Sequence, residues 1–130
     1  LASRLTAIEN SRSACFDFVG NLDDFDNISL YEGTVEEILP AIIDQIKPID
    51  LAVLDPPRAG LNAKARHALT DLAPSQIIYI SCDPSTLSRD LKHLAQAGYS
   101  LQSLHAFDMF PQTAHAETMT VLRRTQRVTS

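Results

Sequence analysis

The segment YISCDPSTLSRDL, residues 79–91, predicts a buried strand that runs directly into a capped helix. Cys82 stands at the carboxyl end of that strand. In open α/β sheets, ligands bind in the crevice outside the carboxyl ends of the strands. A thiol at this place is therefore expected to face a substrate rather than to pack in the core.

Strands and helices alternate along the rest of the chain. Short apolar runs predict strands at residues 5–8, 28–31, 51–54, 76–81, 99–107 and 118–123. The segments between them predict helices at residues 11–22, 35–46, 62–72 and 85–97. This order predicts an α/β fold with a mostly parallel sheet and helices on both faces. Because no helix separates the last two strands, these are expected to pair antiparallel as a hairpin with a long loop.

Three local signals carry further expectations. Asn10 or Ser11 is expected to cap the first helix. Pro40 removes a helical donor, so the second helix is expected to be broken or kinked there. The continuous apolar run at residues 51–54 is typical of a strand that is buried on both faces.

Composition places the chain among globular soluble proteins. It has 130 residues, enough for one domain, and 45% of them are hydrophobic. No apolar run approaches the roughly 20 residues that span a bilayer, and no secretory signal is present, so we expect no membrane partner. The first residue is Leu1 rather than methionine, which suggests a piece of a longer protein.

Net charge and cysteine content limit the kinds of ligand and the cellular compartment that we expect. The formal net charge is −5, and an acidic domain does not attract nucleic acid by itself. Either the ligand is not a nucleic acid, or another region supplies a basic surface. The two cysteines, Cys15 and Cys82, give neither a metal-ligand spacing nor a disulfide framework, so we expect no metal and a reducing cytosol.

Two acids stand at the ends of expected strands. Glu9 could accept hydrogen bonds from ribose hydroxyls, as acids at this place do in dinucleotide-type folds. Position alone favours the alternative, in which it caps or faces the next helix. Asp55 precedes Pro56 and Pro57, which fix the backbone and hold Asp55 toward the crevice. In the alternative, an Asp55–Arg58 pair only stabilises a rigid loop without a ligand.

The two cysteines are expected to differ in role. Cys82 precedes a helix amino terminus, whose partial positive charge can stabilise a thiolate. As an alternative, it is a small buried hydrophobe. Cys15 lies mid-helix between apolar neighbours and is expected to belong to the core.

A further carboxylate, Glu117, follows a loop that contains His115. Glu117 could act as a general base. It could also be a cross-strand partner of Arg123 or Arg124, and spacing does not choose between these roles. His115 alone is more often a packing or hydrogen-bonding residue than a catalyst.

Three segments together resemble the RNA uracil-5-methyltransferases, which use S-adenosylmethionine to make 5-methyluridine in tRNA or ribosomal RNA. These segments are DPPRAG at residues 55–60, SCDPSTLSRDL at 81–91 and FPQTAHAE at 110–117, in the order of the family. The resemblance implies a Rossmann-like class I methyltransferase sheet, and residues 1–130 would form part of the catalytic domain.

The resemblance also assigns roles to individual residues. It implies that Cys82 is the nucleophile and Glu117 the base. It implies that Glu9 holds the ribose of the cofactor, that Thr34 lies near its adenine, and that Asp55 lines the cofactor and target-base site. The cofactor would be S-adenosylmethionine and the partner tRNA or ribosomal RNA.

Some family features fall before residue 1. The resemblance implies that the first strand, the glycine-rich cofactor loop and the RNA-binding regions lie upstream. The upstream strand would fit between the strands at residues 5–8 and 51–54, so the 130 residues alone are expected to lack measurable methyl transfer. Two alternatives stay open: a degenerate scaffold or RNA-docking fragment without activity, and methylation of an exocyclic amine, which needs no cysteine.

Overall fold

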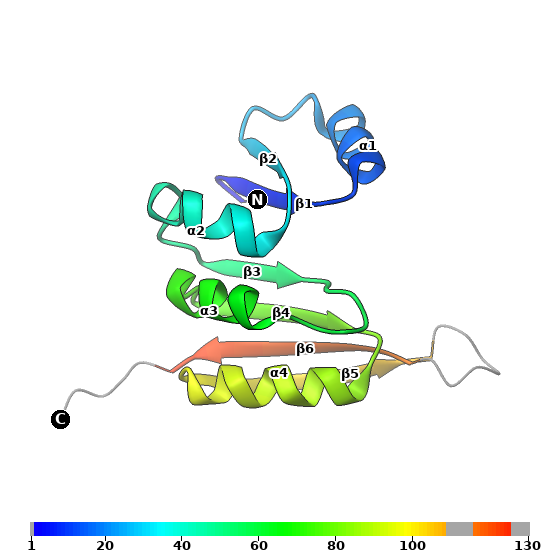
Figure 1. Ribbon diagram of the computed structural model, residues 1–130, viewed down its shortest axis with the longest axis vertical. Coiled ribbons are helices and arrows are strands. Elements are labelled where there is room, and N and C mark those ends of the chain that lie inside the picture. Colours follow the sequence, from blue (N-terminus) through cyan, green and yellow to red (C-terminus); the bar gives the residue numbers. More distant parts are fainter. Residues whose placement is uncertain (1, 109–115, 126–130) are drawn as a thin grey trace. The chain divides into compact units, whose positions relative to one another are not determined.

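The computed structural model describes residues 2–108 and 116–125. The chain divides into two compact units, Leu1–Lys47 and Pro48–Ser130 (Figure 1). Within the described residues, no helix is long and apolar enough to cross a membrane. That the 130 residues form part of one catalytic domain stays a prediction.

The first unit contains two strands and two helices. These are β1 (Leu5–Glu9), α1 (Arg12–Leu22), β2 (Ile28–Glu32) and α2 (Val35–Ile46). The two strands run parallel and in register from the Leu5–Ile28 pair to the Glu9–Glu32 pair, so their carboxyl ends coincide. Ser11 caps α1 through its hydroxyl, which accepts a hydrogen bond from the Ala14 amide at 3.4 Å, as expected.

Helix α2 runs through Pro40 without a break. Of the two expected outcomes, a break at Pro40 is wrong, and a kink there stays a prediction. Proline removes one helical donor, a cost of about 3 kcal/mol in a helix interior. Leu39, Ile42 and Ile46 are buried along one side of α2. Burying each such side chain contributes about 1.5–3 kcal/mol, and together these outweigh the lost bond.

The second unit contains four strands and two helices. They are β3 (Leu51–Leu54), α3 (Ala63–Leu72), β4 (Gln76–Ser81), α4 (Pro84–Gln96), β5 (Tyr99–Phe107) and β6 (Glu117–Arg124). The strand order is β3-β4-β6-β5, with β3 and β4 parallel (Figure 1). Strand β6 runs antiparallel to both β4 and β5, which confirms the expected pairing of the last two strands.

One face of this sheet forms the core of the second unit. Ile77 and Tyr79 of β4 and Leu122 of β6 are almost wholly buried. Leu87 and Leu94 of α4 are buried as well. The Tyr79 hydroxyl donates a hydrogen bond to Asp90 of α4, which places α4 over this face. Strand alternation then directs the residues between them to the opposite face.

Strand β3 differs from the sequence expectation. Its side chains are not buried on both faces, because Leu51 is 45% and Val53 60% exposed. In the part of the chain that the structure describes, β3 lies at the edge of its sheet and pairs with β4 alone. An apolar run predicts burial only when neighbours flank the strand, and β3 has a neighbour on one side.

Two buried tyrosines give a test of the core. The Tyr79 hydroxyl donates to the Asp90 carboxylate at 2.6 Å, and the Tyr99 hydroxyl donates to the neutral carbonyl of Pro74 at 2.7 Å. We expect Tyr79→Phe to lower the free energy of unfolding by about 1.5–3 kcal/mol, because its partner is charged, and Tyr99→Phe by about 1 kcal/mol. Urea unfolding of the two variants measures the difference. A smaller loss for Tyr79→Phe than for Tyr99→Phe would contradict this view of the core.

Candidate active site

Cys82 and Glu117 lie at the same end of the second sheet. Strands β4 and β6 pair in register as far as Ser81 and Thr118. Cys82 directly follows Ser81, in a bend after β4, and Glu117 directly precedes Thr118 as the first residue of β6, where it pairs with Phe107 of β5. A thiol and a carboxylate thus stand next to the last pair of this ladder.

Burial changes by one residue at this end of the β4–β6 ladder. Ser81 and Thr118 are buried, whereas Cys82 and Glu117 are half-buried. Successive side chains of a strand point to opposite faces, so Glu117 of β6 faces away from the core under α4. Cys82 stands in the bend after β4, and that its thiol faces a substrate stays a prediction.

Asp55 reaches the same end of the sheet from β3. Leu54 pairs with Tyr79, so Asp55 follows β3 at the level of Ile80. Its side chain is exposed. The carboxyl ends of the parallel strands β3 and β4 thus place Asp55 near the strand end that carries Cys82, and the structure gathers three predicted residues in one region.

A network of short hydrogen bonds fixes the turn around Cys82. The Ser81 hydroxyl donates to the Asp83 carbonyl at 3.0 Å and accepts from the Asp83 amide at 3.1 Å. The Asp83 carboxylate caps α4 by accepting from the amides of Ser85 at 3.0 Å and Thr86 at 2.9 Å. These bonds hold the backbone on both sides of Cys82.

The Asp83 cap also affects the positive potential that the amino terminus of α4 would present to Cys82. Amide donors of Thr86 and Ser85 lower the pKa of the Asp83 carboxyl below its usual value, the Thr86 amide most. Two of the amides at the start of α4 that have no partner within the helix, those of Ser85 and Thr86, are therefore bonded to the Asp83 carboxylate. Stabilisation of a Cys82 thiolate by this helix end stays a prediction, and it competes with the charge of Asp83.

The lowered pKa of Asp83 predicts an acid-sensitive cap. Charged Asp83 stabilises the folded state above the ordinary value of 3.8, and this contribution is lost as the pH falls through its lower folded-state pKa. Asp83→Asn keeps a capping oxygen but cannot titrate. We expect the thermal midpoint of the variant to fall less than that of the natural protein between about pH 6 and pH 3. Equal slopes in differential scanning calorimetry would refute a titrating cap.

Cys15 is buried, whereas Cys82 is half-buried. Cys15 is 5% exposed, and its thiol donates to the Glu9 carbonyl at 3.4 Å. Burial, and then the charges of Glu32 and Glu9, raise the pKa of the Cys15 thiol. Cys15 is therefore a core residue, as expected.

This contrast predicts selective labelling. In the folded protein, iodoacetamide should modify Cys82 at least about tenfold faster than Cys15, because the thiolate is the reactive form and Cys15 is buried with a raised pKa. Mass spectrometry after brief labelling gives the ratio, and labelling in urea provides the unfolded control. Faster modification of Cys15 would exclude Cys82 as the accessible nucleophile.

Glu9 lies at the carboxyl end of β1, in the first unit. Its carboxylate accepts a hydrogen bond from the Ser11 amide at 2.7 Å, next to the start of α1. Its carbonyl accepts from the Gly33 amide at 2.9 Å. The contact with Ser11 is the one that the capping alternative predicts, and the role of Glu9 toward a cofactor stays a proposal.

Thr34 lies at the corresponding end of β2, where it is the N-cap residue of α2. Its hydroxyl donates to the Glu37 carboxylate at 2.9 Å. Because Glu9 pairs with Glu32, Glu9 and Thr34 share one end of the two-stranded sheet. The structure thus collects these two residues in the first unit and the other three in the second. His115 lies outside the described residues.

Sequence reasoning missed Asp90, which is fully buried in α4. Its carboxylate accepts hydrogen bonds from the Leu61 amide at 2.8 Å and from the Tyr79 hydroxyl, and it forms ion pairs with Arg66 and Arg89 at 3.3 and 2.9 Å. Burial and the bond to Asp90 raise the pKa of Tyr79 well above its ordinary range. The signal was present in the sequence, since Asp90 occupies an otherwise apolar stripe.

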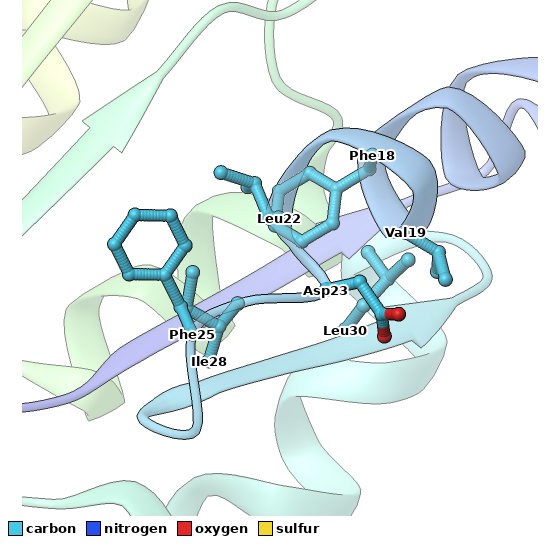
Figure 2. Close-up of a pocket in the computed structure, with 7 residues that line it drawn as sticks. All are labelled: Phe18, Val19, Leu22, Asp23, Phe25, Ile28 and Leu30. Atoms are coloured by element: carbon cyan, nitrogen blue, oxygen red, sulfur yellow. The ribbon is translucent and has the colours of Figure 1, made fainter.

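A hollow of about 190 Å³ lies in the first unit, away from the predicted residues. Figure 2 shows its lining by α1, β2 and the segment between them, namely Phe18, Val19, Leu22, Asp23, Phe25, Ile28 and Leu30. None of these was predicted to act in the site. The hollow is therefore separate from the ends of β1 and β2 that carry Glu9 and Thr34.

Solved structures define the class of protein. The chain is similar to the Pyrococcus abyssi tRNA (uracil-54, C5)-methyltransferase in complex with S-adenosyl-L-homocysteine, with a TM-score of 0.76 and 28% identity over 92% of this chain and 28% of that one. Aeropyrum pernix fibrillarin with bound S-adenosyl-L-methionine gives a TM-score of 0.70 at 15% identity, over 90% of this chain and 55% of that one, which shows the fold alone. The chain has the α/β fold of class I S-adenosylmethionine-dependent methyltransferases.

Sequence comparison then gives the family. Residues 39–125 match the family described as tRNA (Uracil-5-)-methyltransferase, and the chain belongs to this family. An uncharacterized RNA methyltransferase of Streptomyces coelicolor is 42% identical over 88% of this chain and 25% of its own length. One from Thermotoga maritima is 38% identical over 97% of this chain and 28% of its own length. The chain thus spans about a quarter of the curated relatives that it matches.

Proposed function

We propose that this chain carries the catalytic residues of an RNA (uracil-5-)-methyltransferase, which transfers a methyl group from S-adenosylmethionine to C5 of a uridine in tRNA or ribosomal RNA. The observation that carries the proposal is that Cys82, Glu117 and Asp55 stand at one end of the second sheet, next to the last pairs of β4 with β6 and of β3 with β4. Family membership supports it, because the three residues stand in the segments that resemble the family.

The chemistry explains why these residue types are needed. Uracil C5 is a poor nucleophile, and addition of the Cys82 thiolate to C6 moves the electron pair of the C5–C6 double bond toward C5 and the neighbouring carbonyl. C5 then forms a bond to the methyl group, while the electron pair of the old bond stays with the departing sulfur. Glu117 removes the proton from C5, the double bond re-forms, and the thiolate leaves C6.

The pairing of the two strands suits this sequence of steps. C5 and C6 are bonded neighbours, so a nucleophile and a base must reach adjacent atoms of one ring. Cys82 and Glu117 could do so, because they stand next to the Ser81–Thr118 pair, the last pair of the β4–β6 ladder. Asp55 at the end of β3 would orient the target base or the cofactor, and such positioning can supply about 7 kcal/mol or more of the barrier.

The first unit supplies groups that fit the cofactor. S-adenosylmethionine would provide an electrophilic methyl group when bound. Glu9 offers carboxylate oxygens to ribose hydroxyls, and Thr34 offers a hydroxyl near the adenine, both from one end of parallel strands. This end of a parallel pair is the place where nucleotide ligands bind in related folds.

RNA binding also requires that the target base reach the site and that basic groups contact the phosphates. The target base must leave its stack to reach a thiol at a sheet end. With a net charge of −5, this chain supplies little attraction for phosphates. We propose that basic surfaces outside these 130 residues hold the RNA.

The test compares two substitutions in the full-length protein that carries this chain. Cys82→Ala should abolish methylation and any covalent complex with RNA. Glu117→Gln keeps the size of the side chain but removes the base, so it should still allow methyl transfer and then stall with RNA bound through Cys82. A denaturing gel should show a slow-migrating protein–RNA band for Glu117→Gln and none for Cys82→Ala.

A matched control and a suicide substrate complete this test. Cys15→Ala removes the buried thiol, and folded Cys15→Ala protein should retain the covalent complex. RNA with 5-fluorouridine should trap the natural protein on Cys82, because a C5 that carries fluorine has no proton for the base to remove, and the bond from Cys82 to C6 then stays. Methylation by Cys82→Ala would sink the covalent mechanism and point to exocyclic amine chemistry, whereas natural protein without methylation or adduct would indicate a scaffold. Normal turnover by Glu117→Gln would make Glu117 a structural partner and leave His115 as the next base to test.

A further inference from the structure

The loop after β3 is fastened to α4 by side chains that the proposed reaction does not use. The bonds join the backbone of residues 58–61 to one side of the helix. They run from the Thr86 hydroxyl to the Arg58 carbonyl at 2.8 Å, from Arg89 Nη2 to the carbonyls of Ala59 at 2.9 Å and Leu61 at 3.0 Å, and from the Leu61 amide to Asp90 Oδ2 at 2.8 Å. The segment that begins at Asp55 therefore has a fixed path over α4.

The base of this loop has little freedom. Asp90 is fully buried, and each of its carboxylate oxygens accepts at least two hydrogen bonds. Gly60 has a φ of +70°, and a Cβ at this position would lie 2.6 Å from Asp90 Oδ2. The backbone approaches the carboxylate as closely as a residue without a side chain permits, so the loop cannot shift here without breaking the cluster.

Thr86 extends the connection to the catalytic end. Its hydroxyl bonds to the Arg58 carbonyl and also lies 3.3 Å from the Asp83 carbonyl, in the residue that follows Cys82. Its amide donates to the Asp83 carboxylate. One side chain thus touches both segments of the candidate site, the one after β3 and the one after β4.

We propose that Thr86 is a positioning residue, which sets the separation between the Asp55 segment and Cys82. The inference rests on the proposed methyl transfer, and it deepens that proposal. Near-attack geometry is sensitive, since a displacement of about 1 Å can cost about a hundredfold in rate. Loss of one bridging bond, with the Asp90 cluster intact, should shift the segment by less than that.

The test uses the full-length protein and four variants. Thr86→Val removes the bridging hydroxyl and keeps the shape, and Thr86→Ser restores the hydroxyl. Thr70→Val is the matched control, because the Thr70 hydroxyl donates to the Arg66 carbonyl at 2.9 Å within α3 and bridges no segments. Cys82→Ala reports on the underlying function. Methyl transfer to RNA gives kcat and KM, and thermal unfolding gives the folded fraction.

We expect Thr86→Val to lower kcat about tenfold with KM for RNA within about twofold. Thr86→Ser should recover at least half of the natural kcat, and Thr70→Val should stay within about twofold of it. The inference is overturned if Thr86→Val behaves like Thr70→Val, if Thr86→Ser is as slow as Thr86→Val, if the change falls on KM alone, or if it vanishes after correction for folded protein. Full methylation by Cys82→Ala would instead overturn the proposed function, and the inference with it.

Discussion

The buried carboxylate of Asp90 is the interaction on which the second unit depends. Its donors come from the loop after β3, from β4, from α3 and from α4 itself. The carboxylate reaches its full set of donors only when all four segments are in place, and removal of one partner from a buried ion pair costs about 3–5 kcal/mol. A single side chain thereby ties the arrangement of the helices to the path of the segment that begins at Asp55.

The polar cluster around Asp90 holds the segments in a defined orientation, which apolar packing alone would not do. Hydrogen bonds weaken steeply away from their preferred angles, whereas apolar contacts tolerate sliding. The bonds of Ser81, Asp83 and Thr86 continue the directional contacts from the buried cluster to the strand end that carries Cys82. The proposed site would have to align a thiol, a base and a methyl donor, and it would gain from such rigidity because alignment enters the rate directly.

Much of the fold could be predicted from the sequence, since its signals are local. Apolar runs and capping residues place every helix and strand within about one residue of its observed ends. The break at Pro40 and the burial of Val53 were wrong because both depend on packing beyond the segment itself. Cys82 and Asp55 were placed at strand ends that face the crevice, whereas the position of Glu117 at the same sheet end was not predicted. Asp90 was missed because Leu61, Arg66 and Tyr79, three of its four partners, lie on other elements that only the fold brings to it.

The strand order also bears on how the protein folds during synthesis. Strand β6 enters the sheet between β4 and β5, so Glu117 reaches the sheet end near Cys82 only after the strands before it have been made. The β4–β6 pairs join residues about forty positions apart, and such non-local contacts form slowly. Until β6 docks, β4 and β5 present unpaired backbone edges that invite association with other chains. The sheet of the second unit thus closes only when β6 has been made, and the nascent chain depends on rapid docking of this strand.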